Sequence, residues 1–98
     1  MKKKISPIHP GEILREDFLI PMNISAYRLA KDTFIDQTRI SEIIKGKRSV
    51  TIDTALRFSE YFGTSAEFWI NIQTQYDMEI KRNLLQDELK KIRPVKYA

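Results

Sequence analysis

Residues 25–47 read SAYRLAKDTFIDQTRISEIIKGK, and this stretch decides the fold of the chain. Its apolar residues recur at helical spacing in two short runs, which predicts two amphipathic helices joined by a tight turn. Ser25 is the expected N-cap of the first helix, because its hydroxyl can accept from a free backbone N–H. Asp36 is the expected N-cap of the second, and Gly46 stands where a left-handed C-terminal residue is favoured.

The two predicted helices differ in their surfaces. The first has a small apolar face, which suits the close approach of another helix, and it consists of Ala26, Leu29, Ala30 and Thr33. The second is anchored on one side by Ile40, Ile43 and Ile44. Its opposite side is polar and carries Gln37, Thr38, Arg39, Ser41, Glu42 and Lys45. Burial of the isoleucines therefore turns a row of hydrogen-bonding side chains outward.

This pattern resembles the helix-turn-helix of the phage-repressor/Cro-like (XRE) family. The match runs without a gap through Leu29-Ala30, Ile35, Ile40, Ile43 and Gly46-Lys47. The flanks are similar to antitoxins of the HigA/VapI type, in His9-Pro10-Gly11-Glu12, Gly46-Lys47-Arg48-Ser49, Asp53-Thr54-Ala55-Leu56-Arg57, and Glu67-Phe68-Trp69 with Gln73 and Tyr76-Asp77. The resemblance implies an all-α, five-helix, lambda-repressor-like DNA-binding domain whose second helix-turn-helix element enters the major groove.

Phe34 departs from the family pattern, which usually has glycine at this position because the turn takes a positive φ there. A bulky residue is strained in that conformation. Either the turn is altered in this chain, or Phe34 adopts the positive φ at a cost in energy. The sequence leaves both outcomes open.

Length and composition bound the class of protein. A chain of 98 residues predicts one domain with a modest core, to which burial in a dimer would add. The absence of cysteine excludes disulfides, thiol catalysis and cysteine-ligated zinc, and favours a cytoplasmic setting. No apolar run approaches the roughly 20 residues needed to span a bilayer, so we expect no membrane partner.

The charges are unevenly distributed along the chain. The total is +4, but residues 25–51 carry +3 while residues 52–80 carry −4. Attraction of phosphate needs a local positive surface more than a large total charge. The basic block therefore favours contact with nucleic acid, with a merely solvated face as the alternative.

The remaining chain divides into three predicted parts. Residues 1–8 form a basic N-terminal arm that includes Lys2, Lys3 and Lys4, residues 9–80 form the DNA-binding domain, and residues 81–98 form a basic helical extension. Pro10 suits the first position of a helix. That helix would continue from Glu12 to Ile20, bury Ile13, Leu14 and Phe18, and stop at Pro21.

Two further helices are predicted after the basic loop. Thr51 would cap the first, which ends at Gly63 and has an inner face of Ile52, Ala55, Leu56, Ser59 and Phe62. Thr64 and Glu67 have capping-box spacing and would open the next. Its apolar stripe would be Phe68, Trp69, Ile72, Tyr76 and Ile80. Helix would run on toward Ile92 with a second stripe of Leu84, Leu85, Leu89 and Ile92, or break near Asp77.

The polar side of the second helix of the motif has the chemistry needed to read DNA. Short polar side chains near the start of a helix can reach base edges in the major groove. The candidate base-reading residues are Gln37, Thr38, Arg39, Ser41 and Glu42. The candidate phosphate-binding residues are Ser25, Tyr27, Arg28, Lys45, Lys47, Arg48 and Ser49. A solvated helix face is again the alternative.

Other chemistry is weakly supported. His9 is the only histidine, and beside Pro10 it is expected to start a helix rather than to bind metal or act as a catalyst. No nucleophile with a base, metal-ligand set or phosphate-binding glycine loop is visible, so we expect neither an enzyme nor a cofactor. The candidate dimer or partner interface is Trp69, Ile72, Tyr76 and Ile80, with burial in the core as the alternative reading of Trp69 and Tyr76.

The expected function is a sequence-specific DNA-binding transcriptional regulator that binds a palindromic operator as a homodimer. The resemblance implies an antitoxin that represses its own operon and neutralises a RelE-like ribonuclease toxin. The alternatives are a protein-interaction module with antitoxin activity alone, and a stand-alone regulator without a toxin.

Overall fold

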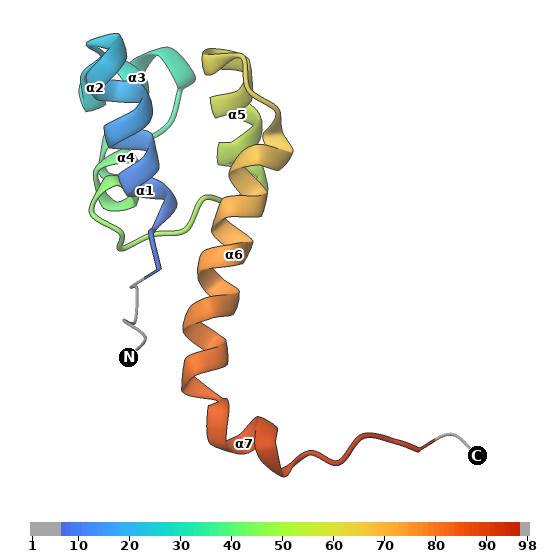
Figure 1. Ribbon diagram of the computed structural model, residues 1–98. Helices are drawn as coiled ribbons and strands as arrows, with labels where there is room; N and C mark the ends of the chain where they lie inside the picture. The colour runs from blue at the N-terminus through green and yellow to red at the C-terminus, as the bar shows by residue number, and fades with distance from the viewer. Residues whose placement is uncertain (1–6, 97–98) are drawn as a thin grey trace.

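The computed structural model describes residues 7–96, and these form helices with no strand among them, which confirms the all-α prediction (Figure 1). The predicted arm residues Lys2, Lys3 and Lys4 lie outside the described residues. None of the helices within residues 7–96 combines the length and the apolar character needed to cross a membrane. The elements are α1 (Pro10–Ile13), the π-helix η1 (Leu14–Leu19), α2 (Ile20–Met22), α3 (Ala26–Thr33), α4 (Gln37–Ile44), α5 (Ile52–Phe62), α6 (Ala66–Leu84) and α7 (Gln86–Lys91).

The first three elements form one continuous helical run. The prediction that Pro21 stops this helix is wrong, because the run continues to Met22 and ends at Asn23, which has a φ of 54°. The π-helical segment ends at Leu19, two residues before Pro21, and Ile20 N–H donates to the Arg15 carbonyl. Proline lacks an N–H donor and crowds the preceding turn, so the chain absorbs it through this local distortion.

One hydrophobic core holds the helices together. Its fully buried side chains include Leu14, Leu29, Ile40, Ile43, Phe58 and Trp69. The Trp69 ring lies 5.0 Å, between centroids, from the rings of Phe18 and Phe58, so aromatic contacts join the first helical run, α5 and α6. The predicted isoleucine anchor of α4 is confirmed, with Ile40 and Ile43 fully buried and Ile44 partly buried.

The predicted inner face of α5 is partly wrong. Ile52 and Leu56 are 69% and 54% exposed, whereas Thr54, Ala55 and Phe58 are buried. The helix is rotated about its axis so that the large Phe58 ring, which the pattern missed, packs edge-on against Trp69. The expected cap at Thr51 is confirmed, since its hydroxyl accepts from Thr54 N–H at 3.3 Å.

The start of α6 is shifted by one residue from the prediction. Ser65, not Thr64, is the N-cap, because its hydroxyl accepts from Phe68 N–H at 3.0 Å. The Thr64 hydroxyl instead accepts from Trp69 Nε1 at 2.8 Å. The indole needs a partner for its N–H when its ring is buried, and this contact supplies it.

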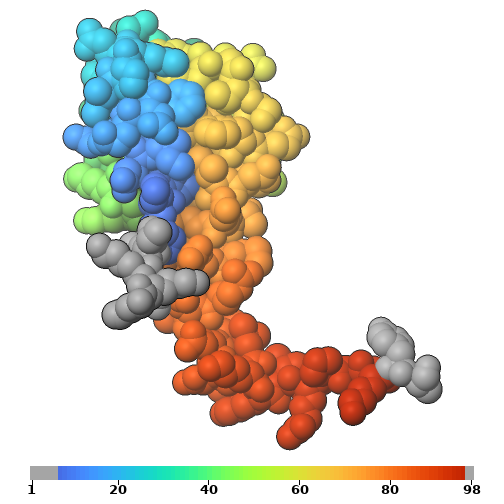
Figure 2. All heavy atoms as spheres, in the orientation of Figure 1, coloured from blue at the N-terminus to red at the C-terminus, as the bar shows by residue number. Residues whose placement is uncertain are grey.

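A long projection follows the packed part of α6. The helix passes through Asp77 without a break and ends at Leu84, and α7 lies across its end instead of continuing the helix to Ile92 (Figures 1 and 2). Every residue from 78 to 96 is exposed, including Leu84 and Leu89. We call residues 78–96 the C-terminal arm.

The turn between α3 and α4 keeps the conformation that usually requires glycine. Phe34 has φ 59° and ψ 36°, which is left-handed backbone, and its side chain is 86% exposed. The turn is therefore unaltered, and Phe34 bears the strain. Left-handed backbone costs a residue with a Cβ roughly 1–2 kcal/mol.

We expect Phe34→Gly to stabilise the protein by about 1 kcal/mol, because glycine removes this strain and little apolar burial is lost. The midpoint of thermal unfolding should rise by about 4–8 °C. Phe34→Ala is the control, since it keeps the Cβ and should change stability by less than about 0.5 kcal/mol. An equal gain from both variants would show that removal of the exposed ring, and not relief of the backbone, is the cause.

Candidate nucleic-acid interface

The outer side of α4 forms a shallow polar depression. Four of the five candidate base-reading residues line it together with two candidate phosphate-binding lysines, and the set is Gln37, Thr38, Ser41, Glu42, Lys45 and Lys47. We call these six residues the reading face. Its side chains point outward because Ile40 and Ile43, on the opposite side of the same helix, are fully buried.

Arg39 is the base-reading candidate that the structure places apart. It lies on the flank of α4 toward α5, and its Nη1 is 3.9 Å from Oδ1 of Asp53. The sequence pattern did not indicate this pairing, because Asp53 belongs to the next helix of the domain. To join the reading face, the Arg39 side chain has to leave that carboxylate.

Two other candidates are paired with each other. Arg48 donates from Nε to Glu42 Oε1 at 2.8 Å, and its Nη2 lies 2.7 Å from the same oxygen. Both side chains remain partly exposed. The guanidinium therefore orients the Glu42 carboxylate and partly neutralises it, which reduces the repulsion that a bare carboxylate would meet near phosphates.

The start of α3 lies beside the reading face and carries the remaining candidates. Ser25 is confirmed as the N-cap, and its hydroxyl accepts from Arg28 N–H at 3.0 Å. The side chains of Tyr27 and Arg28 are exposed. Asp36 occupies the N-cap position of α4, as predicted, but its side chain makes no capping hydrogen bond.

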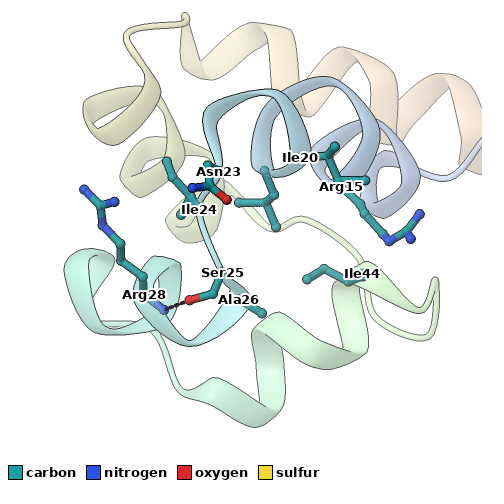
Figure 3. A pocket seen from close by; sticks show the side chains of 9 residues that line it. Arg15, Ile20, Asn23, Ile24, Ser25, Ala26, Arg28 and Ile44 are labelled. Carbon is teal, nitrogen blue, oxygen red and sulfur yellow. Dashed lines mark hydrogen bonds between the residues drawn. The ribbon is translucent and has the colours of Figure 1, made fainter.

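A groove separates this start of α3 from the first helical run. Figure 3 shows Ser25 and Arg28 on one side, Arg15 and Ile20 on the other, and Ile44 from the end of α4. Arg15 was not among the sequence candidates, because it belongs to the helical run that precedes the motif. It pairs with the neighbouring Glu16 and adds a second cation to the rim of the groove.

The C-terminal end of α4 is packed against the start of α1. A Cβ on Gly11 would lie only 1.7 Å from the Ile43 carbonyl oxygen, so only glycine allows this approach. His9 caps α1 by accepting from Gly11 N–H at its Nδ1, at 2.9 Å. Its ring packs beside Gly46 and edge-on to Tyr76, 4.8 Å away between centroids. The expectation that His9 starts a helix is confirmed.

The basic loop after α4 is anchored to α6. Gln73 is 5% exposed, and its Oε1 accepts from Val50 N–H at 2.8 Å. Its Nε2 donates to Asp77 Oδ1 at 3.0 Å, so both ends of the amide are used. The loop that carries Lys47, Arg48 and Ser49 is thereby held at a fixed place beside the reading face.

The candidate interface on α6 needs one correction. Trp69 is fully buried within this chain, so it belongs to the core and offers no surface to a partner. Ile72 and Tyr76 are partly buried, and Ile80 is 37% exposed. Residues 7–96 hold no group of three or more histidine, aspartate or glutamate side chains arranged to bind a metal ion.

The sequence is similar to a protein-family model and to known proteins. Residues 14–69 match the protein-family model described as Helix-turn-helix. The chain is 49% identical over 79 residues to virulence-associated protein I of Dichelobacter nodosus, an alignment that covers 81% of this chain and 73% of that protein. It is 34% identical to antitoxin HigA-1 of Vibrio cholerae, over 96% of this chain and 89% of that one.

A solved structure extends the similarity to three dimensions. The antitoxin HigA of Pseudomonas aeruginosa, solved with the higBA promoter, superimposes with a TM-score of 0.89 at 35% sequence identity. The match covers 92% of this chain and 99% of that chain.

We expect His9 to make stability depend on pH near neutrality. Burial lowers the pKa of His9 below its ordinary value of 6.5, against a smaller opposing effect of Asp77. The fold thus favours the neutral ring, so the contribution of His9 is complete above pH 6.5 and is lost as pH falls through the lowered pKa. The midpoint of thermal unfolding should fall from about pH 7 to about pH 5.

His9→Asn is the matched control for that measurement, because asparagine keeps a side-chain acceptor for Gly11 N–H and does not titrate. The variant should lose the part of the pH dependence that His9 causes. If both proteins lost the same number of degrees over this interval, another group would be responsible.

Proposed function

The chain belongs to the helix-turn-helix family, and on this basis we propose that it is a sequence-specific DNA-binding transcriptional regulator. The observation that carries the proposal is the reading face, a row of hydrogen-bonding side chains held outward on α4 by buried isoleucines. A helix of this kind fits the major groove, where each base pair presents a distinct pattern of donors and acceptors. The promoter bound by the Pseudomonas HigA supports the same use here.

Base recognition is proposed for the side chains of Gln37, Thr38, Ser41 and Glu42 within the reading face. Gln37 suits a bidentate contact to adenine, Glu42 suits acceptance from a cytosine amine, and the methyl group of Thr38 suits contact with thymine. Ser41 can donate to or accept from either kind of edge. Arg39 would read guanine or grip phosphate only after it separates from Asp53.

Phosphate contacts are assigned to the two ends of the motif. One set lies at the start of α3, and the other lies at the end of α4 and in the loop anchored by Gln73. Cations and helix N-termini bind phosphate oxygens and set the register of the protein on DNA. The proposed residues are Ser25, Tyr27, Arg28, Lys45, Lys47, Arg48 and Ser49.

A homodimer is proposed because one short helix reads few base pairs. Two-fold symmetry doubles the site and places half-sites about 34–36 Å apart on a palindromic operator. The proposed seam continues from Ile72 and Tyr76 through Ile80 into the apolar residues of the C-terminal arm. The leucines of this projection are exposed in the part of the chain that the structure describes, which favours their burial by a partner.

The physiological role is proposed from the relatives. Antitoxin HigA-1 and the Pseudomonas HigA support a role as the antitoxin of a toxin–antitoxin module that represses its own operon. The partner would be a RelE-like ribonuclease, and a role on operator DNA would place the protein in the cytoplasm. Residues 9–80 would bind DNA. Residues 81–98 would make protein contacts together with Ile72, Tyr76 and Ile80.

We expect Gln37→Ala and Lys47→Ala to weaken DNA binding in different ways. The probe is a duplex selected from a random pool by the unmodified protein, with a scrambled duplex beside it. Gln37→Ala should cost about 1–3 kcal/mol on the selected duplex only. Lys47→Ala should weaken both duplexes and reduce the slope of log K against log salt by about one.

Thr74→Ala, an exposed change on the side of α6 away from Ile72 and Tyr76, is the control and should leave both affinities unchanged. The rival reading, a protein-interaction module without DNA recognition, predicts that no duplex is enriched. If a duplex were enriched and Gln37→Ala bound it as tightly as the unmodified protein does, another surface than the reading face would recognise the sequence.

We expect Ile80→Glu to convert the dimer into a monomer, because it places a charge on the proposed apolar seam. Sedimentation equilibrium should show the change, and affinity for a two-half-site duplex should fall while the protein stays folded by circular dichroism. Asn71→Glu introduces the same charge on the opposite side of α6 and should leave the dimer intact. A dimer that persists in Ile80→Glu would place the seam elsewhere.

A further inference from the structure

The side chain of Arg57 reaches from α5 to the turn between α3 and α4. Its Nη1 donates to the Thr33 carbonyl at 2.9 Å and to the Phe34 carbonyl at 3.3 Å. Its Nε donates to Asp53 Oδ1 at 2.7 Å, so a carboxylate one helical turn away holds the guanidinium in place. The planar guanidinium spans acceptors that a single-point ammonium could not contact together.

These carbonyls lie where the backbone is strained. The last carbonyls of a helix have no partner within the helix and need one from elsewhere. Phe34, the second of the two residues, is the one with left-handed backbone. On the other side of the turn, the N–H groups of Phe34 and Ile35 both donate to the Ala30 carbonyl. Arg57 therefore completes the hydrogen bonding of a turn that lacks its usual glycine.

The same face of α5 also contacts both helices of the motif. Tyr61, one turn after Arg57, donates its hydroxyl to Asp32 Oδ2 at 2.7 Å near the end of α3. This hydrogen bond is the main reason that the pKa of Asp32 lies below its ordinary value. Asp53 is also the carboxylate that lies 3.9 Å from Arg39 on α4. Side chains of α5 thus fix α3, the turn and α4 relative to one another.

We propose that Arg57, held by Asp53, is a positioning residue that clamps the turn in its left-handed conformation and so sets the angle at which α4 meets DNA. Only the second part of this proposal, the angle at which α4 meets DNA, rests on the proposed function. Arg57 itself does not line the reading face, and its Nε and Nη1 donors are committed within the protein. It acts through the turn, and DNA contact is left to the residues of α4.

A double-mutant cycle without DNA tests the clamp. Arg57→Ala should lower the midpoint of thermal unfolding and speed hydrogen exchange at the amides of Phe34 and Ile35. In the Phe34→Gly background the same substitution should cost less, because glycine holds the left-handed turn without help. Arg57→Lys should behave like Arg57→Ala, since it keeps the charge but not the planar fork.

Glu60→Ala, which removes an exposed charge elsewhere on α5, is the control and should leave stability and exchange unchanged. Additive effects of Arg57→Ala and Phe34→Gly would overturn the clamp, because they would show that the two residues do not act on the same turn.

Binding to the selected and scrambled duplexes tests the effect on α4. Arg57→Ala should weaken the selected duplex about tenfold, leave the scrambled duplex unchanged, and leave the salt slope unchanged. Equal losses on both duplexes with a slope reduced by about one would overturn the positioning role, because Arg57 would then contact phosphate itself. Failure of the unmodified protein to select any duplex would refute the proposed function, whereas the cycle without DNA decides the clamp by itself.

Discussion

The rotation of α4 about its own axis is fixed by Ile40 and Ile43, which are fully buried, and the reading face depends on it. The contact between Gly11 and the Ile43 carbonyl fixes how deeply the end of the helix is seated against α1. Turning α4 would expose two isoleucines and bury polar side chains without partners, both of which cost free energy. A small helix can therefore present one defined surface.

Local signals in the sequence were sufficient for the helices of the motif, for both ends of α5 and for the orientation of α4. Ser25 and Thr51 cap their helices, Gly46 and Gly63 end theirs with positive φ, and the isoleucine spacing predicts the buried side. Each of these depends on residues within a few positions of one another, so pattern and propensity report them correctly.

The predictions that failed concern side chains whose partners are set by tertiary packing and not by the local pattern. The packing of Phe58 on Trp69 rotates α5, and the indole of Trp69 takes the Thr64 hydroxyl, so Ser65 becomes the cap. Asp53 holds Arg39 away from the reading face for the same reason. The spacing of residues in the sequence does not predict these partners. The strained turn at Phe34 also has a nonlocal partner, because Arg57, 23 positions along the chain, donates to the Phe34 carbonyl.

Amide and methyl chemical shifts, recorded by NMR while a selected duplex is added, show which surface of the protein meets DNA. We expect the largest changes at the start of α3 and at the amides of Gln37, Thr38, Ser41 and Glu42. The methyl shifts of Ile40 and Ile43 should be nearly unchanged. Changes confined to the C-terminal arm, or large shifts of those isoleucine methyls, would show that DNA meets another surface or another rotation of α4.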